Sequence, residues 1–303
     1  MRRAIRLKEY TPSSVIRNIP PEWYLRAKDS TLENREYLLR TDPNGFILSG
    51  PNYDTSDLQI VVLGDSIVEA MYVDEHSRMC SHLETSLAEL IGRPIQVLNG
   101  GYSGATSLHL FNVFLNKVVP LKPVAVLLMT SVLDADVAVR KGDYWNKDCW
   151  LEPLLDVDLH NTVRDNEFRP APDYSSRPKL LSLFQTAGAQ FDIPVWFATA
   201  PHRQLFQGEY IKKTFKNRAD FDAEVAHRRA VNAITRKFAL ENKAPLFDLE
   251  ISMIDKHDIY YDMFHHNARG GGVAAKHLID AGLARAVAAR LEARRPNNCG
   301  SKS

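Results

Sequence analysis

The sequence has few cysteines and no long run of apolar residues. Only three of its 303 residues are cysteines, and they are widely spaced, so neither a disulfide framework nor a cysteine-based zinc site is expected. No apolar stretch approaches the roughly 20 residues that a membrane-spanning helix needs, and the first residues are not followed by a signal-peptide core. We therefore expect a cytoplasmic protein that does not bind membranes.

An excess of charge of either sign is also missing. The 38 lysines and arginines nearly balance the 37 aspartates and glutamates, which leaves a formal net charge of +1. This balance does not favour a nucleic-acid partner. The composition, 45% hydrophobic and 25% charged, is that of a globular protein with one large domain or one domain with appendages.

A short apolar run ends at a serine near the start of the chain. Residues 60–63 are rich in β-branched side chains and predict a buried strand, which Gly64, Asp65 and Ser66 follow directly. Ligands collect at the carboxyl ends of the strands in an open α/β sheet, so Ser66 is a candidate nucleophile. Taken alone, the motif is weak evidence for a nucleophile, because the turn preferences of glycine and aspartate explain it better.

An acid and a histidine three residues apart occur near the other end of the chain. Asp262 and His265 precede an alanine-rich stretch. A serine is a weak nucleophile at neutral pH, so it needs an imidazole to accept its proton and a carboxylate to orient that imidazole. Ser66, His265 and Asp262 are therefore candidates for a Ser-His-Asp triad that forms only on folding.

These motifs resemble those of the SGNH hydrolases, also called the GDSL-like esterase and lipase family. The resemblance covers about residues 58–292: residues 64–66 match the nucleophile block, residues 99–104 the second block and residues 262–265 the closing block. It implies no metal or cofactor. It implies that Ser66 is the nucleophile, His265 the base and Asp262 the acid that orients the base. The backbone N–H groups of Ser66 and Gly101 would donate to the oxyanion. Asp65, Asn99 and Leu133 would lie at the substrate.

The third block departs from the family pattern. Family members have an asparagine that stabilises the oxyanion, but this chain has Leu133 at that position, in residues 131–134. Loss of one side-chain donor typically lowers turnover about a hundred- to a thousand-fold, while backbone donors remain. We therefore expect a slow enzyme. The family also implies that the neighbouring Asp134 holds loops together.

Five apolar segments separated by helical patterns predict the fold. They indicate a three-layer α/β/α sandwich with a mostly parallel sheet, and the resemblance implies flavodoxin-like strand order. The expected strands are residues 60–63, 95–98, 124–129, 195–199 and 245–249, and the expected helices lie near residues 74–91, 107–116, 180–191, 219–240 and 271–293. Residues 1–57 are interpreted as an N-terminal wrap on a catalytic domain of residues 58–295, which contains a lid-like insertion at about 140–178, and residues 296–303 as a disordered tail.

The resemblance suggests an esterase that acts on a small acyl ester, such as an acetyl ester of a carbohydrate. The partner would then be a small-molecule or glycan ester; the oligomeric state stays open. Three alternatives remain: an O-acetyltransferase with the same triad, a degenerate glycan-binding protein, and a metal-assisted hydrolase that uses His257, Asp258, Asp262, His265 and His266. His202 and Arg203 follow the fourth strand, where we expect surface charge, and Arg269 with three following glycines is read as a turn rather than an anion site.

Overall fold

Five parallel strands form the centre of the molecule. The computed structural model describes residues 3–49, 57–156 and 167–294. The strands are β4 (Gln59–Gly64), β5 (Gln96–Gly101), β6 (Ala125–Met129), β8 (Val195–Ala198) and β9 (Leu246–Phe247), in the order β5-β4-β6-β8-β9. Numbered along the chain, this is the flavodoxin-like order 2-1-3-4-5. The predicted five-stranded α/β fold is confirmed.

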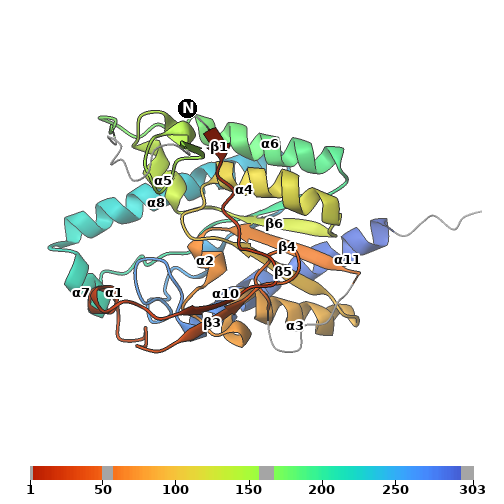
Figure 1. Ribbon diagram of the computed structural model, residues 1–303, viewed down its shortest axis with the longest axis horizontal. Coiled ribbons are helices and arrows are strands. Elements are labelled where there is room, and N and C mark those ends of the chain that lie inside the picture. The colour runs from red at the N-terminus through yellow and green to blue at the C-terminus, as the bar shows by residue number, and fades with distance from the viewer. Residues whose placement is uncertain (1–2, 50–56, 157–166, 295–303) are drawn as a thin grey trace, which may run out of the picture.

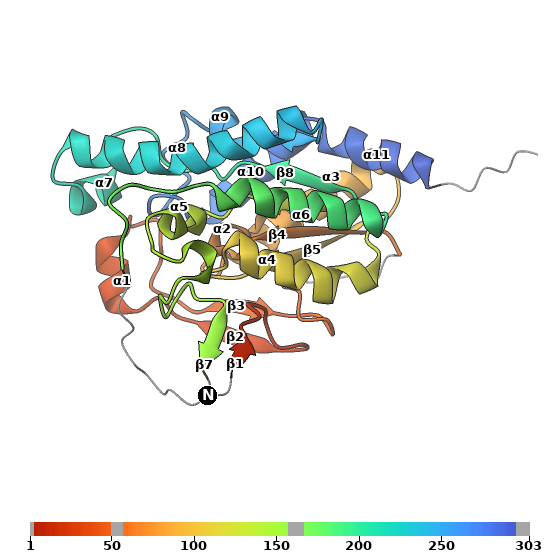
Figure 2. The ribbon, with the colours of Figure 1, turned by 90° about the horizontal axis from the view of Figure 1, so that it is seen from above.

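Helices cover both faces of this sheet (Figures 1 and 2). Successive side chains of a strand point to opposite faces, so Ile60 and Val62 pack on one side of β4 and Val61 and Leu63 on the other. The first side is covered by α3 (Met79–Ile91), α10 (Ala268–Asp280) and α11 (Leu283–Ala293), and the second by α4 (Ser107–Val113), α6 (Ser176–Gln190) and α8 (Arg218–Glu241). Both sides of the strands are therefore apolar, as their unbroken hydrophobic runs predict.

The last helix of the prediction is in fact two helices. The sequence pattern predicts one helix over residues 271–293, but α10 begins earlier, at Ala268, and ends at Asp280. Gly282, with a φ of 99°, then separates it from α11. A left-handed backbone cannot continue an α-helix, which explains why the single-helix prediction is wrong.

The N-terminal segment pairs with other parts of the chain. Its elements are β1 (Arg3–Ile5), β2 (Val15–Asn18), α1 (Glu22–Ala27) and β3 (Tyr37–Arg40). Strands β2 and β3 form an antiparallel pair, β1 pairs with β7 (Leu154–Asp156), and Ile47 bridges Asn99 on the edge strand β5. Because these contacts connect residues 3–49 to both β5 and β7, the segment lies directly on the sheet domain. The proposed division of the chain at about residue 57 remains a prediction.

The stretch interpreted as a lid is partly packed into the molecule. Tyr144 and Leu151 are buried in an apolar cluster, whereas Trp145 and Trp150 are exposed. Residues 157–166 and the tail at 296–303 lie outside the described residues, and the lid itself remains a prediction.

In the part of the chain that the structure describes, no helix is long and apolar enough to span a membrane. The remaining short helices are α2 (Ser66–Glu69), α5 (Leu133–Ala138), α7 (Glu209–Thr214) and α9 (Leu249–Ser252), with one-turn elements at Glu75–Ser77, Phe114–Val118, Val119–Leu121 and Asp143–Trp145.

Candidate active site

Ser66 lies at a sharp turn between β4 and the short helix α2. Asp65 is the N-cap of this helix, and its carboxylate accepts a hydrogen bond of 2.9 Å from the N–H of Ile67. A Cβ on Gly64 would lie 2.3 Å from Cγ2 of Val68, so only glycine allows the chain to turn this closely. The turn leaves the Ser66 side chain partly exposed at the carboxyl edge of the sheet.

Asp262 and His265 are held together by the loop that precedes α10. One carboxylate oxygen of Asp262, Oδ1, accepts the backbone N–H groups of Phe264 and His265 at 3.0 and 2.8 Å. The other, Oδ2, lies 2.7 Å from Nδ1 of His265. A three-residue spacing thus lets one tight turn fix both the backbone and the ring.

The ring of His265 reaches across to Ser66. Its Nε2 lies 2.7 Å from Oγ of Ser66, although the two residues are 199 positions apart. An ionised carboxylate only accepts hydrogen bonds, so Nδ1 donates to Asp262 and Nε2 is left to accept the hydroxyl proton of Ser66. The ring stacks on Tyr261 at 5.5 Å and packs against Phe264 at 4.5 Å between centroids.

The electrostatic surroundings keep Asp262 ionised. Burial works against its charge, but the neighbouring His265 and Lys28 outweigh burial and hold the pKa of the Asp262 carboxyl well below its usual range. Lys28 comes from the N-terminal segment, and its Nζ lies 2.8 Å from Oδ2 of Asp262. A charged carboxylate is the state that orients an imidazole.

The assignment of the Gly101 N–H to an oxyanion hole is wrong. This N–H already donates to Oδ1 of Asn99 at 2.9 Å, and a Cβ on Gly101 would lie 2.1 Å from the backbone N of Glu69. Gly101 is therefore a packing glycine that lets β5 approach α2.

The free backbone donor on this loop belongs to Gly104. The N–H groups of its neighbours bond within the protein: Tyr102 to Gly64, Ser103 to Glu69, Ala105 to Tyr102 and Thr106 to His109. Among the described residues, the N–H groups of Gly104 and Ser66 have no acceptor. Ser103 ties the loop to Glu69, on the same short helix as Ser66.

Two residues that the resemblance implies at the substrate are instead buried supports. Asp65 and Asn99 are each 1% exposed. Asp65 accepts the N–H of Val132 at 2.7 Å, and the Asn99 amide donates to the carbonyl of Val68 at 2.8 Å. Because their polar atoms are used in these bonds, both hold loops together and neither faces a substrate. Leu133, the first residue of α5, is partly buried against two apolar clusters, and its role at the substrate remains a prediction.

The charged residues after β8 are buried and not on the surface as predicted. His202 and Arg203 are each 1% exposed. The Arg203 guanidinium pairs with Asp29 and donates to the carbonyl of Asp262 at 2.7 Å. Arg203 thus supports the loop that holds Asp262. Its charge is neutralised by Asp29, within the protein, and not by a ligand.

The histidine and aspartate side chains of residues 257–266 contact different partners. Within the described ranges no group of three or more metal-ligating side chains is placed to hold a metal ion. Asp258 pairs with Arg269, and His266 is buried against Tyr260. At the start of α10, Asn267 caps the N–H groups of Arg269 and Gly270, so these donors are occupied, as a turn predicts.

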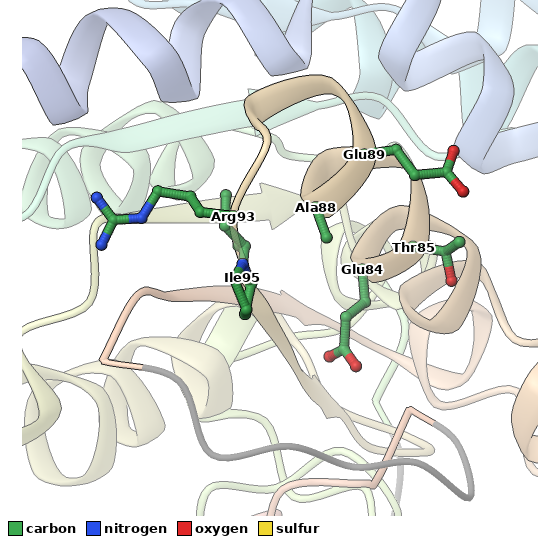
Figure 3. A pocket seen from close by; sticks show the side chains of 7 residues that line it. Glu84, Thr85, Ala88, Glu89, Arg93 and Ile95 are labelled. Atoms are coloured by element: carbon green, nitrogen blue, oxygen red, sulfur yellow. The ribbon is translucent and has the colours of Figure 1, made fainter.

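A hollow of about 450 Å³ lies near the amino end of β5, away from the carboxyl ends of the strands (Figure 3). Its wall is made by the second half of α3 and by residues 93–95, which precede β5, whereas Ser66 follows the end of β4. In Figure 3 the labelled side chains are those of Glu84, Thr85, Ala88, Glu89, Arg93 and Ile95. None of them is arranged as a nucleophile with a base, so the hollow is separate from the candidate site.

Comparison with known proteins identifies the family. The model of the GDSL-like Lipase/Acylhydrolase family matches residues 62–273, which include Ser66 and His265. The chain belongs to this family. Members of the GDSL family are lipases and acylhydrolases, and membership therefore supports ester hydrolysis as the class of activity. No curated protein matches this GDSL-family chain closely enough to count as a relative.

Two solved structures share the fold of this chain. One is the acetyl xylan esterase AlAXEase, which is 16% identical with a TM-score of 0.50, over 74% of this chain and 100% of that one. The other is a catalytic mutant of an acetylxylan esterase from Geobacillus stearothermophilus, 14% identical with a TM-score of 0.52, over 76% of this chain and 96% of that one. At such identities the likeness concerns the fold.

The sequence placed Gly104 in the second block but assigned the oxyanion donor to Gly101, and it did not point to Lys28. Gly104 is identified by its left-handed φ of 79° and its free N–H, neither of which a sequence displays. Lys28 belongs to a segment without any family motif. Its position next to Asp262, 234 residues away, results from folding alone.

Proposed function

We propose that this protein is a serine esterase that forms an acyl-enzyme on Ser66. One observation carries the proposal: the continuous chain of hydrogen bonds from Oγ of Ser66 through the ring of His265 to Asp262, with both links at 2.7 Å. In such a chain each group has the acid-base role that its neighbour requires.

In the first half of the reaction, Oγ of Ser66 attacks the carbonyl carbon of the ester while Nε2 of His265 takes the hydroxyl proton. The imidazolium is stabilised by the ionised Asp262. The carbonyl oxygen becomes an oxyanion, for which the free N–H groups of Ser66 and Gly104 are the available backbone donors. His265 then returns the proton to the leaving alcohol, the carbon–oxygen bond breaks, and the acyl group remains on Ser66.

In the second half, water replaces the alcohol. His265 removes a proton from water as the water oxygen attacks the acyl carbon, and it returns that proton to Oγ of Ser66 as the carboxylic acid leaves. If a sugar hydroxyl occupied the position of the water, the same groups would transfer the acyl group. We therefore treat acyl transfer as an outcome that the experiment must distinguish.

Small acyl esters of carbohydrates are the proposed substrates. Two proteins with this fold are acetylxylan esterases by name, which makes acetylated oligosaccharides the first class to test. The exposed Trp145 and Trp150 lie in the stretch that follows α5, and exposed indole rings can stack on sugars.

The test is to mix the purified protein with 4-nitrophenyl acetate and with acetylated xylo-oligosaccharides and to measure both product release and intact mass. We expect acetate release and, after rapid acid quenching, a single acetyl adduct on Ser66. The variant Ser66→Ala should lose the adduct and at least about a thousand-fold in turnover. Ser182→Ala, which changes an exposed serine on α6, should behave as the wild type.

Each alternative has its own result in this experiment. Product formed only when a sugar acceptor is added would identify a transferase. Turnover that is unchanged in Ser66→Ala would contradict the proposal, and loss of activity with a chelator but not with a serine-directed fluorophosphonate would favour a metal-assisted hydrolase.

A further inference from the structure

A lysine from the N-terminal segment contacts the carboxylate that orients His265. Lys28 is the C-cap of α1, and its Nζ lies 2.8 Å from Oδ2 of Asp262. This is the same oxygen that Nδ1 of His265 approaches at 2.7 Å. The two side chains therefore share one acceptor atom, so a positive charge lies a few ångströms from the ring on which Ser66 depends.

Lys28 is held at this position by several contacts. Its Nζ lies 4.3 Å from the ring centroid of Tyr24 and 5.6 Å from that of Tyr210. The next residue, Asp29, donates its N–H to the carbonyl of Tyr261 at 2.8 Å and pairs with Arg203. The Lys28 side chain is only 15% exposed. Its position is thus fixed by residues on three different parts of the chain.

The orientation of Asp262 does not depend on Lys28. Oδ1 of Asp262 is fixed by two backbone N–H groups, and Oδ2 by the ring of His265. Removal of Lys28 would therefore remove a charge and leave the geometry of the carboxylate in place. This separation allows the electrostatic role of Lys28 to be measured by itself.

We propose that Lys28 is a positioning residue that adjusts how readily His265 accepts a proton, and that the N-terminal segment is thereby part of the active site. This inference rests on the proposed function of Ser66, His265 and Asp262. Lys28 neutralises part of the charge that Asp262 offers to an imidazolium, which disfavours the protonated ring.

Other ionisable groups lie around the ring, and every Lys28 variant keeps them. Asp65 lies on the Ser66 side, and His266 follows the ring in the chain. The phenols of Tyr24, Tyr210 and Tyr261 surround Asp262, and burial raises the pKa of each. Arg203 reaches the backbone of Asp262, while its charge pairs with Asp29. A change caused by Lys28→Met therefore reports on Lys28.

The test compares the pH profiles of kcat/KM for the wild type, Lys28→Met, Lys28→Arg and Lys212→Met. Lys212 is a matched control, because it is an exposed lysine on α7, the helix that contacts α1. We expect Lys28→Met to move the acid limb upward by about one pH unit. On the acid side its kcat/KM then falls about tenfold, whereas the plateau changes little. Lys28→Arg and Lys212→Met should keep the wild-type limb.

Two results would overturn the inference. The first is an acid limb in Lys28→Met at the same pH as in the wild type. This includes a kcat/KM that falls by the same factor at every pH, which is the result expected if Lys28 has a purely structural role. The second is an equal shift in Lys28→Arg, which keeps the charge.

An NMR titration of the His265 ring protons, without substrate, separates this failure from failure of the proposed function. If no acyl adduct forms on Ser66 in the wild type, the proposed function fails. The titration curve should still move to higher pH in Lys28→Met, and an unmoved curve would overturn the role of Lys28.

Discussion

Leu133 is the residue that most clearly sets this site apart from the family pattern. It lies at the start of α5, directly after the turn in which Val132 bonds to Asp65. A leucine side chain cannot donate a hydrogen bond, so the proposed oxyanion hole has only the backbone N–H groups of Ser66 and Gly104. A site with fewer donors stabilises the tetrahedral intermediate less and should turn over slowly.

The variant Leu133→Asn should therefore increase kcat. An amide at this position would add one donor to the oxyanion, and we expect a gain of at least about tenfold toward 4-nitrophenyl acetate. Leu133→Ala is the control, because it removes the same apolar side chain and adds no donor. Steady-state kinetics of both variants would test this, and an equal rise in both, or no rise with asparagine, would contradict it.

At the scale of elements, the N-terminal segment supports the loop that carries Gly104. Nζ of Lys8 donates to the carbonyl of Gly104 at 2.6 Å and to that of Trp150 at 2.7 Å. Lys8 is 3% exposed, and burial, assisted by the charge of Arg6, lowers the pKa of Lys8 from its ordinary value of 10.5 to about 7. One buried amine thus connects the strand-pairing region of β1 and β7 to the second block of the site.

This buried amine should make stability depend on pH above neutrality. Between pH 7 and 10.5 the folded protein has lost the Lys8 proton while the unfolded chain still binds it, so the free energy of unfolding rises with pH. Lys8→Met removes this contribution. The difference in unfolding free energy between wild type and variant should grow from pH 7 to pH 9 in denaturant titrations.

The control for this prediction is Lys276→Met, an exposed lysine on α10 that pairs with Asp280. Its difference from the wild type should be constant over the same pH range. A constant difference for Lys8→Met as well would show that Lys8 keeps its proton in the folded protein.

At the scale of the whole molecule, a buried ion pair connects four helices. Arg177 on α6 pairs with Asp134 on α5, and both side chains are almost completely buried. Asp134 also accepts the backbone N–H of Ser107 at the start of α4, and Arg177 donates to Thr235 on α8 at 2.8 Å. Helices α4, α6 and α8, which cover one face of the sheet, and α5 therefore meet at one salt bridge, consistent with the expectation that Asp134 holds loops together.

Breaking this pair should be strongly destabilising. Arg177→Met leaves the Asp134 charge buried without its partner, which typically costs about 3–5 kcal/mol. Replacing both residues together, Asp134→Leu with Arg177→Met, should restore part of that loss, because no unpaired charge remains. Thermal or chemical unfolding of the three proteins measures this, and a double variant that is less stable than Arg177→Met would contradict it.

The sequence by itself determined the fold class and the three residues proposed for catalysis. The apolar runs of the five strands, the Gly64 turn before Ser66, and the three-residue spacing of Asp262 and His265 are local patterns, and local sterics and hydrogen bonding decide their outcome. Only the tertiary structure decided which N–H is free, that Arg203 is buried, and that Lys28 lies beside Asp262. Those properties depend on partners up to 234 residues away, and the identity of such a partner is not contained in any local pattern.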